Sequence, residues 1–587
     1  MDSPKEDAAV IERKISIGNQ NFEYMREKKT FYIDKTNFIR EWWEQEDIVT
    51  LITRPRRFGK TLNLSMMECF FSVNYAGRGK LFEGLSVWEE QEYRALQGTW
   101  PVIFLSFADI KGSSFEEAKK GIVLSLSDLY KKHDYLLRGE ILSESEKKSF
   151  YTFGQYIGDD VDFADTVSET VVTRALKTLM SYMERYYGRK VILFLDEYDA
   201  PMQEAYMNGY WSRLTAFVRS LFNSTFKTNA YLYRGLLTGI TRVSKESVFS
   251  DLNNLEVVTT TSGKYNTSFG FTQEEVSAAL EERGLSAEKE HIRAWYDGFV
   301  FGNRKEIYNP WSITKYLDSG EYGMYWADTS SNQLVSELIR EGTPELKTQM
   351  EELLGGGCLK VALDEQVVFE QLKRMRGAIW SLLLASGYLK PVSRQFSAET
   401  GKFIYDLKIT NHETMLMFRE MIAGWFPEDL TSYGDFKKAL LQGDLNYMNR
   451  FMNDVSRVMF SSFDSGNKPS DQTQPERFYH GFVLGLIVDL SGDYYIRSNR
   501  ESGFGRYDVM MEPKKADGNA IIMEFKVHDA DCESSLEETV RNALNQIAEK
   551  AYDTDLIARG IPKERISLYG FAFQGKKVLI GKDTSCS

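Results

Sequence analysis

The sequence predicts an α/β protein built from several domains. At 587 residues it is several times the length of a usual domain, and its 42% hydrophobic residues can fill several cores. In the first half, short apolar runs alternate with helical stretches such as 115–131 and 167–187. Strands and helices in alternation predict a parallel sheet covered by helices. A shorter α/β segment is expected from 476 to the end.

Four apolar runs are the expected strands of the first sheet. They lie at 48–53 (IVTLIT), 102–107 (VIFLSF), 191–195 (VILFL) and 232–238 (LYRGLLT). The first three are nearly continuous, which is typical of strands that are buried on both faces in a parallel sheet. Arg234 interrupts the fourth run and weakens its strand signal.

Composition narrows the class of protein. A formal net charge of −13 excludes an overall basic coat for nucleic acid, although a local basic groove is compatible with it. The N-terminus lacks the pattern of a signal peptide, and no apolar run reaches the ~18 residues that a membrane span needs. We therefore expect a cytoplasmic protein that does not bind membranes. Neither a zinc site nor a disulfide framework is indicated, because four scattered cysteines form no C-x-x-C pair: Cys69, Cys358, Cys532 and Cys586.

A phosphate-binding loop is indicated by LITRPRRFGKTLN at 51–63. An apolar strand enters the loop, and Gly59, Lys60 and Thr61 form the tail of the G-x-x-x-x-G-K-[ST] pattern before a helical stretch. In such loops, main-chain N–H groups and the positive end of the helix hold phosphates. Lys60 would contact the β- and γ-phosphates of ATP, and the Thr61 hydroxyl would bind Mg²⁺. The alternative is a Gly-Lys-Thr helix start that binds no ligand.

The front of this loop departs from the pattern. Arg54 stands where the first glycine belongs, and an arginine enters the left-handed conformation less easily. We therefore expect the first turn of the loop to differ. Pro55 fixes one φ angle and removes an N–H donor. Arg56 and Arg57 would add charge contacts that offset this loss.

A second strand supplies acidic residues for the same site. KVILFLDEYDAPM ends its apolar run at Asp196 and Glu197, where two carboxylates are costly unless they have a task. Asp196 would help to hold Mg²⁺, and Glu197 would polarise an attacking water. Farther along, Thr238 would sense the γ-phosphate, and Arg242 would contact it in cis or from a neighbouring subunit. The alternatives are a strand end that emerges into solvent and, for Arg242, a solvated side chain in a turn.

The carboxyl-terminal segment carries a second group of charged residues. GRYDVMMEPKKADGNAIIMEFKV predicts a β-hairpin with its turn at 516–519. Because side chains alternate along a strand, Glu524 and Lys526 share one face, and the hairpin can bring Asp508 beside Glu524. The two carboxylates would hold Mg²⁺, which polarises a phosphodiester and activates water. Lys526 would orient that water or stabilise negative charge.

Two further residues would complete a metal-dependent phosphodiester hydrolysis site. Glu476 lies on the helix expected to open the segment, and Gln546 lies in SLEETVRNALNQIAEKAY. The alternative is a surface hairpin with alternating charges, since E-x-K is common on strands. Basic residues near the hairpin would contact phosphates or form solvated surface: Arg497, Arg500, Arg506, Lys514 and Lys515.

The sequence resembles known families over nearly its whole length. The similarity to the AAA-ATPase-like domain of many bacterial proteins rests on FYIDKTNFI, LITRPRRFGKTLNLSMM, VILFLDEYDAPM, LLTGITRVSKESVFSDLNNL and WYDGFVFGNRKEIYNPWSI. The similarity to the PD-(D/E)XK nuclease domain usually fused to it rests on FYHGFVLGLIVDL, SNRESGFGRYDVMMEP, AIIMEFKV and ALNQIAEKAY. The connecting region is matched by YWADTSSNQLV, IWSLLLASGYLKP and YDLKITNHET.

The resemblance implies an additional-strand P-loop fold. It implies that the residues singled out above form a nucleotide site around Lys60 and Asp196 and a nuclease core around Asp508 and Glu524. The RPRRFGK front end is itself a trait of the first family. The nuclease motif departs from its name, because Val509 follows Asp508 and no proline precedes it.

We expect four regions: a P-loop parallel-sheet ATPase domain at 1–265, a lid or winged-helix-like region at 266–330, a helical connecting region at 331–470 and a nuclease-like domain at 471–587. The predicted function is an ATP-binding and ATP-hydrolysing protein coupled to a Mg²⁺-dependent nuclease that acts on DNA or RNA. The alternative is a non-catalytic ATP switch whose nuclease-like domain only binds nucleic acid or a protein. A homo-oligomer stays open, because P-loop relatives often form rings.

Overall fold

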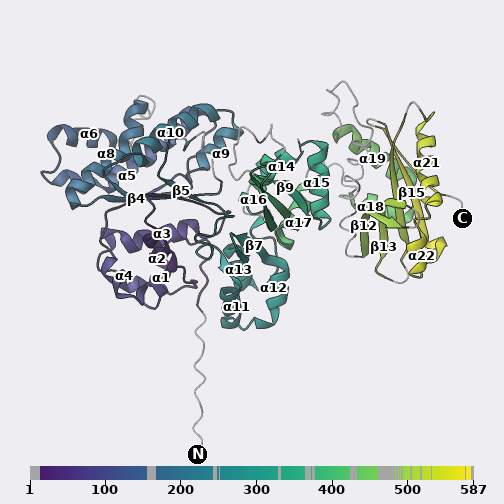
Figure 1. The fold of residues 1–587 in the computed structure, drawn as a ribbon, viewed down its shortest axis with the longest axis horizontal. Helices are drawn as coiled ribbons and strands as arrows, with labels where there is room; N and C mark the ends of the chain where they lie inside the picture. Colours follow the sequence, from purple (N-terminus) through teal and green to yellow (C-terminus); the bar gives the residue numbers. More distant parts are fainter. Residues whose placement is uncertain are drawn as a thin grey trace, which may run out of the picture. The chain divides into compact units, whose positions relative to one another are not determined.

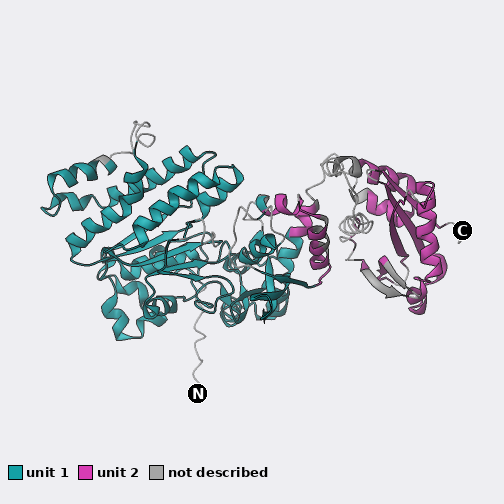
Figure 2. Cartoon of the chain, turned by 45° about the horizontal axis from the view of Figure 1, so that its top comes forward, with its two compact units in different colours: residues 1–334, 358–417 teal, residues 335–357, 418–587 magenta. Residues whose placement is uncertain are grey.

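The fold comes from a computed structural model. It describes residues 13–154, 167–241, 248–249, 251–327, 332–340, 342–363, 372, 377–423, 433–459, 483, 487, 490, 493–502, 505–515, 518–529, 532–574 and 577–583. The chain divides into two compact units, one of residues 1–334 and 358–417 and the other of residues 335–357 and 418–587 (Figure 2). The four regions predicted from the sequence are finer than these units and stay a proposal.

The first unit is built around a five-stranded parallel sheet with the strand order β2-β3-β4-β1-β5. Its strands are β1 (Val49–Thr53), β2 (Val102–Ser106), β3 (Val191–Asp196), β4 (Leu232–Gly239) and β5 (Leu255–Val258). The four predicted strands are confirmed, and every residue of β1 and β3 is buried. Arg234 fits in β4 because its guanidinium donates to the carbonyls of Trp42 and Trp43, at 3.0 and 2.8 Å, and lies over both rings.

The order of the strands confirms the additional-strand arrangement. β4 lies between β1 and β3, so the strand that enters the glycine-lysine-threonine loop is not adjacent to the strand that ends at Asp196. All these strands are parallel, and their carboxyl ends therefore meet at one edge of the sheet. The predicted nucleotide site lies at this edge.

Helices cover both faces of this sheet. They are α1 (Phe22–Glu27), α2 (Asn37–Gln45), α3 (Lys60–Phe71), α4 (Gln91–Leu96), α5 (Phe115–Lys132), α6 (Glu144–Gly154), α8 (Glu169–Tyr187), α9 (Ala200–Met207) and α10 (Trp211–Phe226). Figure 1 shows α5, α8 and α10 on one side of the sheet and α2 and α3 on the other. The spacing of Val172, Leu176, Leu179 and Met183 explains the packing of α8, because it places apolar side chains on one helical face.

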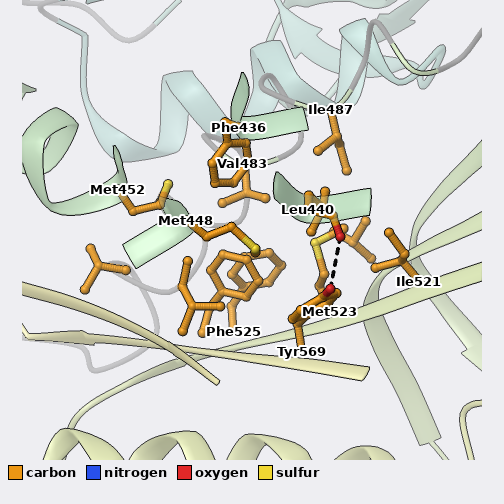
Figure 3. Close-up of a cluster of buried hydrophobic side chains, with 14 of the residues drawn as sticks. Phe436, Leu440, Met448, Met452, Val483, Ile487, Ile521, Met523, Phe525 and Tyr569 are labelled. Carbon is orange, nitrogen blue, oxygen red and sulfur yellow. Dashed lines mark hydrogen bonds between the residues drawn. The ribbon is translucent and has the colours of Figure 1, made fainter. Parts of the chain in front are cut away.

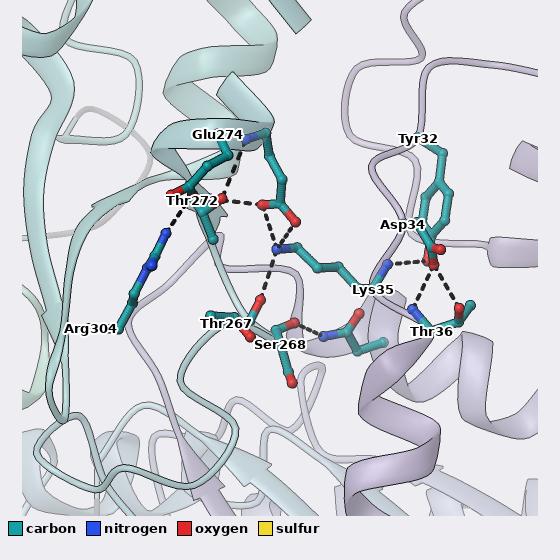
Figure 4. A network of polar contacts seen from close by, with 11 residues as sticks. Tyr32, Asp34, Lys35, Thr36, Thr267, Ser268, Thr272, Glu274 and Arg304 are labelled. Carbon is teal, nitrogen blue, oxygen red and sulfur yellow. Dashed lines mark hydrogen bonds and ion pairs between the residues drawn. The ribbon is translucent and has the colours of Figure 1, made fainter. Parts of the chain in front are cut away.

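A smaller α/β subregion follows. It contains a three-stranded sheet with the order β6-β8-β7. Its elements are β6 (Phe271–Thr272), α11 (Gln273–Glu282), α12 (Lys289–Tyr296), β7 (Asp297–Phe301), β8 (Arg304–Tyr308) and α13 (Pro310–Ser319). The Thr-x-x-Glu spacing of Thr272 and Glu275 is that of a capping box, and the two residues form one at the start of α11. Lys35 ties the N-terminal part of the unit to this helix, since its buried ammonium donates to Glu275 at 2.7 Å and to the carbonyl of Thr267 at 2.8 Å (Figure 4).

The rest of the first unit contains a sheet that the sequence analysis does not predict. Its elements are β9 (Leu359–Ala362), α16 (Ala378–Ala385), β10 (Leu389–Ser397), β11 (Lys402–Ile409) and α17 (His412–Ala423). The strands are antiparallel in the order β10-β11-β9, within a region expected to be helical. The strand signal is weak in β9, which is short, and in β10, which contains Pro391, although β11 (KFIYDLKI) carries aromatic and β-branched residues typical of a strand.

The second unit is built around a mixed five-stranded sheet with the order β12-β13-β14-β15-β16, in which only the pair β14 and β15 is parallel among the described residues. Its strands are β12 (Tyr494–Ser502), β13 (Gly505–Pro513), β14 (Ala520–Val527), β15 (Ile566–Gln574) and β16 (Lys577–Lys582). Its helices are α14 (Gln333–Arg340), α15 (Pro344–Leu354), α18 (Tyr433–Gln442), α19 (Leu445–Met459), α21 (Leu536–Glu549) and α22 (Thr554–Ala558).

Both faces of this sheet are packed. On one face, Ile521, Met523 and Phe525 join the core beneath α18 and α19, where the Tyr569 hydroxyl also donates to the carbonyl of Leu440 at 3.0 Å (Figure 3). On the other face, a second apolar cluster forms with α21 and α22: Met510, Ala520, Ile522, Ile547, Tyr552 and Leu556. The predicted hairpin and the predicted core face of its second strand are therefore confirmed, and Glu524 and Lys526 are left to face α21.

None of the helices in the described part of the chain is both long enough and apolar enough to cross a bilayer.

Candidate nucleotide and nuclease sites

The loop between β1 and α3 is the segment in which the sequence predicts a phosphate-binding loop. Gly59 adopts a left-handed conformation, with φ at 81°, directly before the first residue of α3. Glycine adopts this conformation without the steric cost that a side chain brings. Arg57 is also left-handed, with φ at 63°, whereas Arg54 is not among the residues with positive φ. The expected departure from the pattern is therefore found at Arg57, three residues after the replaced glycine.

Arg54 is fully buried and serves the fold. Its guanidinium donates to the carbonyls of Thr53 and Thr259 at 2.9 and 2.8 Å, and to those of Lys264 and Tyr265 at 3.3 Å. Burial lowers its pKa to about 9. Arg54 thus fastens the loop to the segment that follows β5. The sequence offers no signal for this role, because arginine is rarely fully buried.

Lys60 points into the loop. Its buried ammonium donates to the carbonyls of Arg54 and Pro55, at 3.1 and 3.0 Å. Burial lowers its pKa, and the carboxylates of Glu197 and Asp196 oppose that shift. A cation is therefore held within the loop, close to the acidic end of β3.

Asp196 joins three elements of the site. Its carboxylate is buried and accepts hydrogen bonds from the hydroxyls of Thr61 and Thr238, at 2.6 and 2.5 Å. These contacts link the end of β3 to the start of α3 and to the end of β4. The hydroxyl and carboxylate oxygens suit Mg²⁺, which prefers oxygen ligands. The predicted contact of Thr238 with a γ-phosphate stays a prediction.

Glu197 and Asp199 shape the opposite side of the site. Glu197 is left-handed, with φ at 47°, and burial raises its pKa whereas the ammonium of Lys60 lowers it. Asp199, for which the sequence predicts no role, accepts hydrogen bonds from the amides of Ile240 and Thr241 at 3.1 and 2.8 Å. It therefore fixes the turn after β4. Arg242 lies outside the described residues.

The two remaining arginines of the loop contact protein groups. Arg56 donates from its guanidinium to Gln203 Oε1 at 3.3 Å. Its carbonyl accepts from Asn309 Nδ2 at 3.3 Å and from Trp326 Nε1 at 3.0 Å, two residues that the sequence analysis missed for want of any spacing signal. The guanidinium of Arg57 lies 4.5 Å from the centre of the Trp311 ring. The contacts of both arginines with phosphate stay predictions.

The second unit brings its predicted carboxylates together. Val509 on β13 pairs with Met523 on β14, so Asp508 and Glu524 are the next positions along this antiparallel pair. The amide of Phe525 donates to Asp508 Oδ2 at 2.8 Å, which places that carboxylate against the chain beside Glu524. Burial raises the pKa of Tyr552, and the charges of Glu524 and Asp508 raise it further. Both carboxylates therefore act on one hydroxyl.

Gln546 on α21 connects the predicted residues. Its side-chain carbonyl accepts a hydrogen bond from Lys526 Nζ at 2.7 Å, and its amide nitrogen donates to Glu524 Oε1 and, at 3.2 Å, to the hydroxyl of Tyr552. The structure thus brings Glu524, Lys526 and Gln546 into direct contact. Tyr552 is an addition that the sequence analysis missed, although it ends the quoted helical stretch. Glu476 lies outside the residues that the structure describes.

The electrostatics of this group favour a bound cation. Burial raises the pKa of Asp508 to about 6, and the amide of Phe525 and the charge of Lys526 act against that shift. A buried carboxylate with a raised pKa is stabilised in its charged form when a cation binds. Two neighbouring carboxylates with too little positive charge around them to balance both are consistent with a bound divalent ion.

The two candidate centres offer oxygen atoms of the kind that Mg²⁺ takes as ligands. Within the described ranges, no cluster of three or more His, Cys, Asp or Glu side chains is placed to hold a metal ion. One centre offers the Thr61 hydroxyl and the Asp196 carboxylate, and the other offers the carboxylates of Asp508 and Glu524. Mg²⁺ is commonly held by one or two carboxylates, with water and substrate phosphates as its other ligands.

Comparisons with known proteins find two domain families in the chain. The model of the predicted AAA-ATPase family matches residues 16–249, and the model of the PD-(D/E)XK nuclease superfamily matches residues 474–583. An uncharacterized protein in the vnfD 5′ region of Azotobacter chroococcum mcd 1 is 25% identical over 576 residues, which are 96% of each chain. Domains of these two kinds usually use a nucleotide and a divalent metal, and they suggest ATPase and nuclease activity and an interaction with nucleic acid. The chain joins a predicted AAA-ATPase domain to a domain of the PD-(D/E)XK nuclease superfamily.

Proposed function

We propose that this protein binds and hydrolyses ATP at the loop of residues 54–61, and that ATP controls a Mg²⁺-dependent nuclease in its carboxyl-terminal domain. The observation that carries the proposal is the contact set of Gln546, which holds Lys526 and Glu524 on one face of the sheet. Asp508 reaches the same place through its bond to the amide of Phe525. A solvated surface hairpin would not need a partly buried network of acid, amide and lysine side chains.

In the nuclease site, each side chain has a distinct task. Asp508 and Glu524 would hold Mg²⁺, which polarises the scissile phosphate and lowers the pKa of its bound water. Lys526, oriented by Gln546, places the attacking water or stabilises the charge that develops on the phosphate. Because the pKa of Asp508 is about 6, the fully ionised site forms above that pH.

In the nucleotide site, the described side chains supply charge and position. Lys60 provides a cation next to the carboxylates of β3, and Asp196 fixes the Thr61 hydroxyl at the start of α3. Thr61 and Asp196 would hold Mg²⁺, which would supply positive charge to the phosphates of a bound nucleotide. Glu197 is placed on the same edge and would orient the attacking water. A cytoplasmic location, where ATP, Mg²⁺ and nucleic acid occur together, fits this function.

Cleavage assays on the full chain test the proposal. Labelled single-stranded DNA, duplex DNA and RNA are incubated with and without Mg²⁺ and ATP. We expect cleavage that depends on Mg²⁺ and is abolished by Lys526→Ala. The control variant Lys550→Ala, at an exposed site after α21, should cleave as the parent does. In Lys60→Ala, cleavage should no longer depend on ATP. Absence of cleavage of every substrate, or equal cleavage by Lys526→Ala, rejects the nuclease.

A non-catalytic ATP switch is the second candidate. The net charge of −13 favours it, since an acidic chain grips nucleic acid poorly at physiological salt. The valine after Asp508 also departs from the name motif of the nuclease superfamily. This candidate predicts ATP binding that is lost in Lys60→Ala without scission of any strand. Native mass measurement with and without ATP would show at the same time whether ATP drives the chain into a homo-oligomer.

A further inference from the structure

A histidine continues the row of polar side chains in the nuclease-like site. Glu524 and Lys526 lie on the face of β14 that packs against α21, and alternation along the strand puts His528 next on that face. The amide of His528 donates to the carbonyl of Phe573 at 2.9 Å, so the pairing of β14 with β15 continues to this residue. His528 is therefore held in strand geometry, at the position after Lys526 on the same face.

Helix α21 presents a matching row of side chains. Thr539 and Gln546 are seven residues apart, which places them along one face of the helix. Gln546 contacts Glu524 and Lys526, and the Thr539 hydroxyl lies 2.9 Å from His528 Nδ1. The helix thus runs back along the strand, and His528 lies in the same seam between helix and strand as Lys526.

A charged carboxylate holds one edge of the histidine ring. Glu533 Oε2 accepts from the Thr539 hydroxyl at 2.5 Å and lies 3.4 Å from His528 Nδ1. Burial acts to raise the pKa of Glu533, but hydrogen bonds from Thr539, Asn542 and the amide of Asp529 outweigh it and leave that pKa lowered. Only 7% of the His528 side chain and 11% of the Glu533 side chain are exposed. The ring is therefore fixed beside an ionised acid.

These contacts decide which ring nitrogen keeps its proton. The Thr539 hydroxyl has one proton, and Glu533 at 2.5 Å is a far closer acceptor for it than the carbonyl of Ser535 at 3.4 Å. Toward the ring the hydroxyl oxygen then accepts, so Nδ1 of His528 carries a proton. Within the described ranges, no residue forms a hydrogen bond with Nε2, on the other side of the ring. Nε2 is therefore the nitrogen that can gain and release a proton.

The spacing along β14 suits two roles on one phosphate. Two residues of a strand span about 6.6 Å, so a group of the size of a phosphate fits between the positions of Lys526 and His528. Gln546 orients the first side chain and Thr539 orients the second. An in-line displacement needs one group at the attacking oxygen and another at the leaving oxygen.

We propose that His528 is the general acid of the nuclease reaction, an inference that rests on the proposed function. Water forms the new bond to phosphorus on the side of Lys526, the bond from phosphorus to the leaving oxygen breaks, and Nε2 of the imidazolium gives its proton to that oxygen. A proton of the attacking water passes to solvent, and solvent later returns one to Nε2. Glu533 stabilises the imidazolium, and Nδ1 keeps its proton throughout.

The test compares two leaving atoms at one linkage of an oligonucleotide. The ends of the products that the parent makes in Mg²⁺ identify the leaving oxygen, and a second oligonucleotide carries sulfur in its place. A thiolate leaves without a proton, so a general acid matters for the oxygen substrate alone. Because general acid catalysis contributes about 10²- to 10⁴-fold, His528→Asn should slow cleavage of the oxygen substrate by about that factor. It should cleave the sulfur substrate at nearly the rate of the parent.

Controls separate this role from folding and from binding. The asparagine amide keeps an N–H donor for Thr539, so the seam should stay intact. His291→Asn changes a histidine on α12 whose side chain is 76% exposed, and it should cleave both substrates as the parent does. Fluorescence anisotropy in EDTA should give His528→Asn the parent's affinity for the oligonucleotide.

Three results would overturn the inference while leaving the nuclease in place. They are equal slowing of His528→Asn on both substrates, no slowing on either, and a loss of affinity as large as the loss of rate. A parent that cleaves no linkage at all would instead reject the nuclease proposal, and the general acid with it.

Discussion

The indole Nε1 of Trp326 donates a hydrogen bond of 3.0 Å to the main-chain carbonyl of Arg56 in the phosphate-binding loop, 270 residues earlier in the chain. Trp326 is itself fixed by Glu413, whose fully buried carboxylate accepts from the Trp326 amide at 2.6 Å and from the Ser312 hydroxyl at 2.9 Å. Glu413 lies on α17, the helix in which the chain passes from the first unit to the second. Trp326 and Glu413 together thus connect the loop to that helix.

Removing this hydrogen bond should weaken nucleotide binding. In Trp326→Phe the ring stays but the donor is lost, so the loop is held less firmly in one conformation. A hydrogen bond contributes about 0.5–1.5 kcal/mol, which predicts a Kd for an ATP analogue raised about two- to ten-fold. Titration with a fluorescent analogue measures it. Trp43→Phe, which changes a tryptophan that packs against Trp100 and Tyr233 instead, should leave the Kd unchanged. An unaltered Kd in Trp326→Phe would contradict the prediction.

Restoring the glycine of the P-loop pattern should harm this protein. Arg54→Gly leaves four carbonyls without their donor and opens a cavity, so we expect a loss of about 3–5 kcal/mol of unfolding free energy and no gain in ATP affinity. Denaturant unfolding and ATP titration measure the two effects. Arg57→Gly is the matched control, because it puts glycine at a left-handed position and should change stability by less than about 1 kcal/mol. Equal stability of Arg54→Gly and the parent would refute this role.

The stability of the chain should depend on pH through Asp508. Its pKa is raised to about 6 in the folded chain, so the folded state binds this proton more tightly than the unfolded state does. The stability that this tighter proton binding contributes to the folded chain is complete below pH about 4 and is lost as the pH rises through about 6. At about 1.4 kcal/mol per pH unit, Asp508→Asn should be more stable than the parent by roughly 2–3 kcal/mol at pH 8 in EDTA, and equal to it at pH 4.

Mg²⁺ should narrow this difference. A cation that binds the ionised carboxylates stabilises the parent at pH 8 but has little effect on Asp508→Asn. Thermal unfolding of the parent and of Asp508→Asn, each with Mg²⁺ and with EDTA, measures the effect. Glu549→Gln, at an exposed position on α21, is the control. If Mg²⁺ does not change the melting temperature of the parent at pH 8, that result would argue against a metal at Asp508 and Glu524.

Gln546 should matter for the rate of cleavage more than for the fold. Gln546→Ala releases Lys526 and Glu524 from their common partner, and the loss of such orienting contacts commonly costs 10- to 100-fold in activity or metal affinity. Cleavage rates across a Mg²⁺ series test this. Asn545→Ala, the neighbouring exposed amide on α21, should behave as the parent. If both variants cleave equally well, Gln546 does not position the site.

The sequence by itself determined the features that depend on neighbouring residues. The apolar runs predicted β1 to β4, because strands buried on both faces need continuous apolar side chains. Alternation along 520–527 separated the core face from the face of Glu524 and Lys526, and the spacing of Thr272 and Glu275 predicted a capping box that the structure contains. The glycine-lysine-threonine tail and the acidic end of β3 were found in the same way.

Only the tertiary structure decided which distant groups meet. The buried role of Arg54, the hydrogen bond from Trp326 to Arg56, the bridge by Gln546 and the pairing of β9 with β11 all join residues that are not neighbours in the sequence. No local pattern records such pairs, because a hydrogen bond between distant residues forms only where packing leaves donor and acceptor together and dry. The sequence shows the chemistry of each side chain, and the fold decides which other side chains it meets.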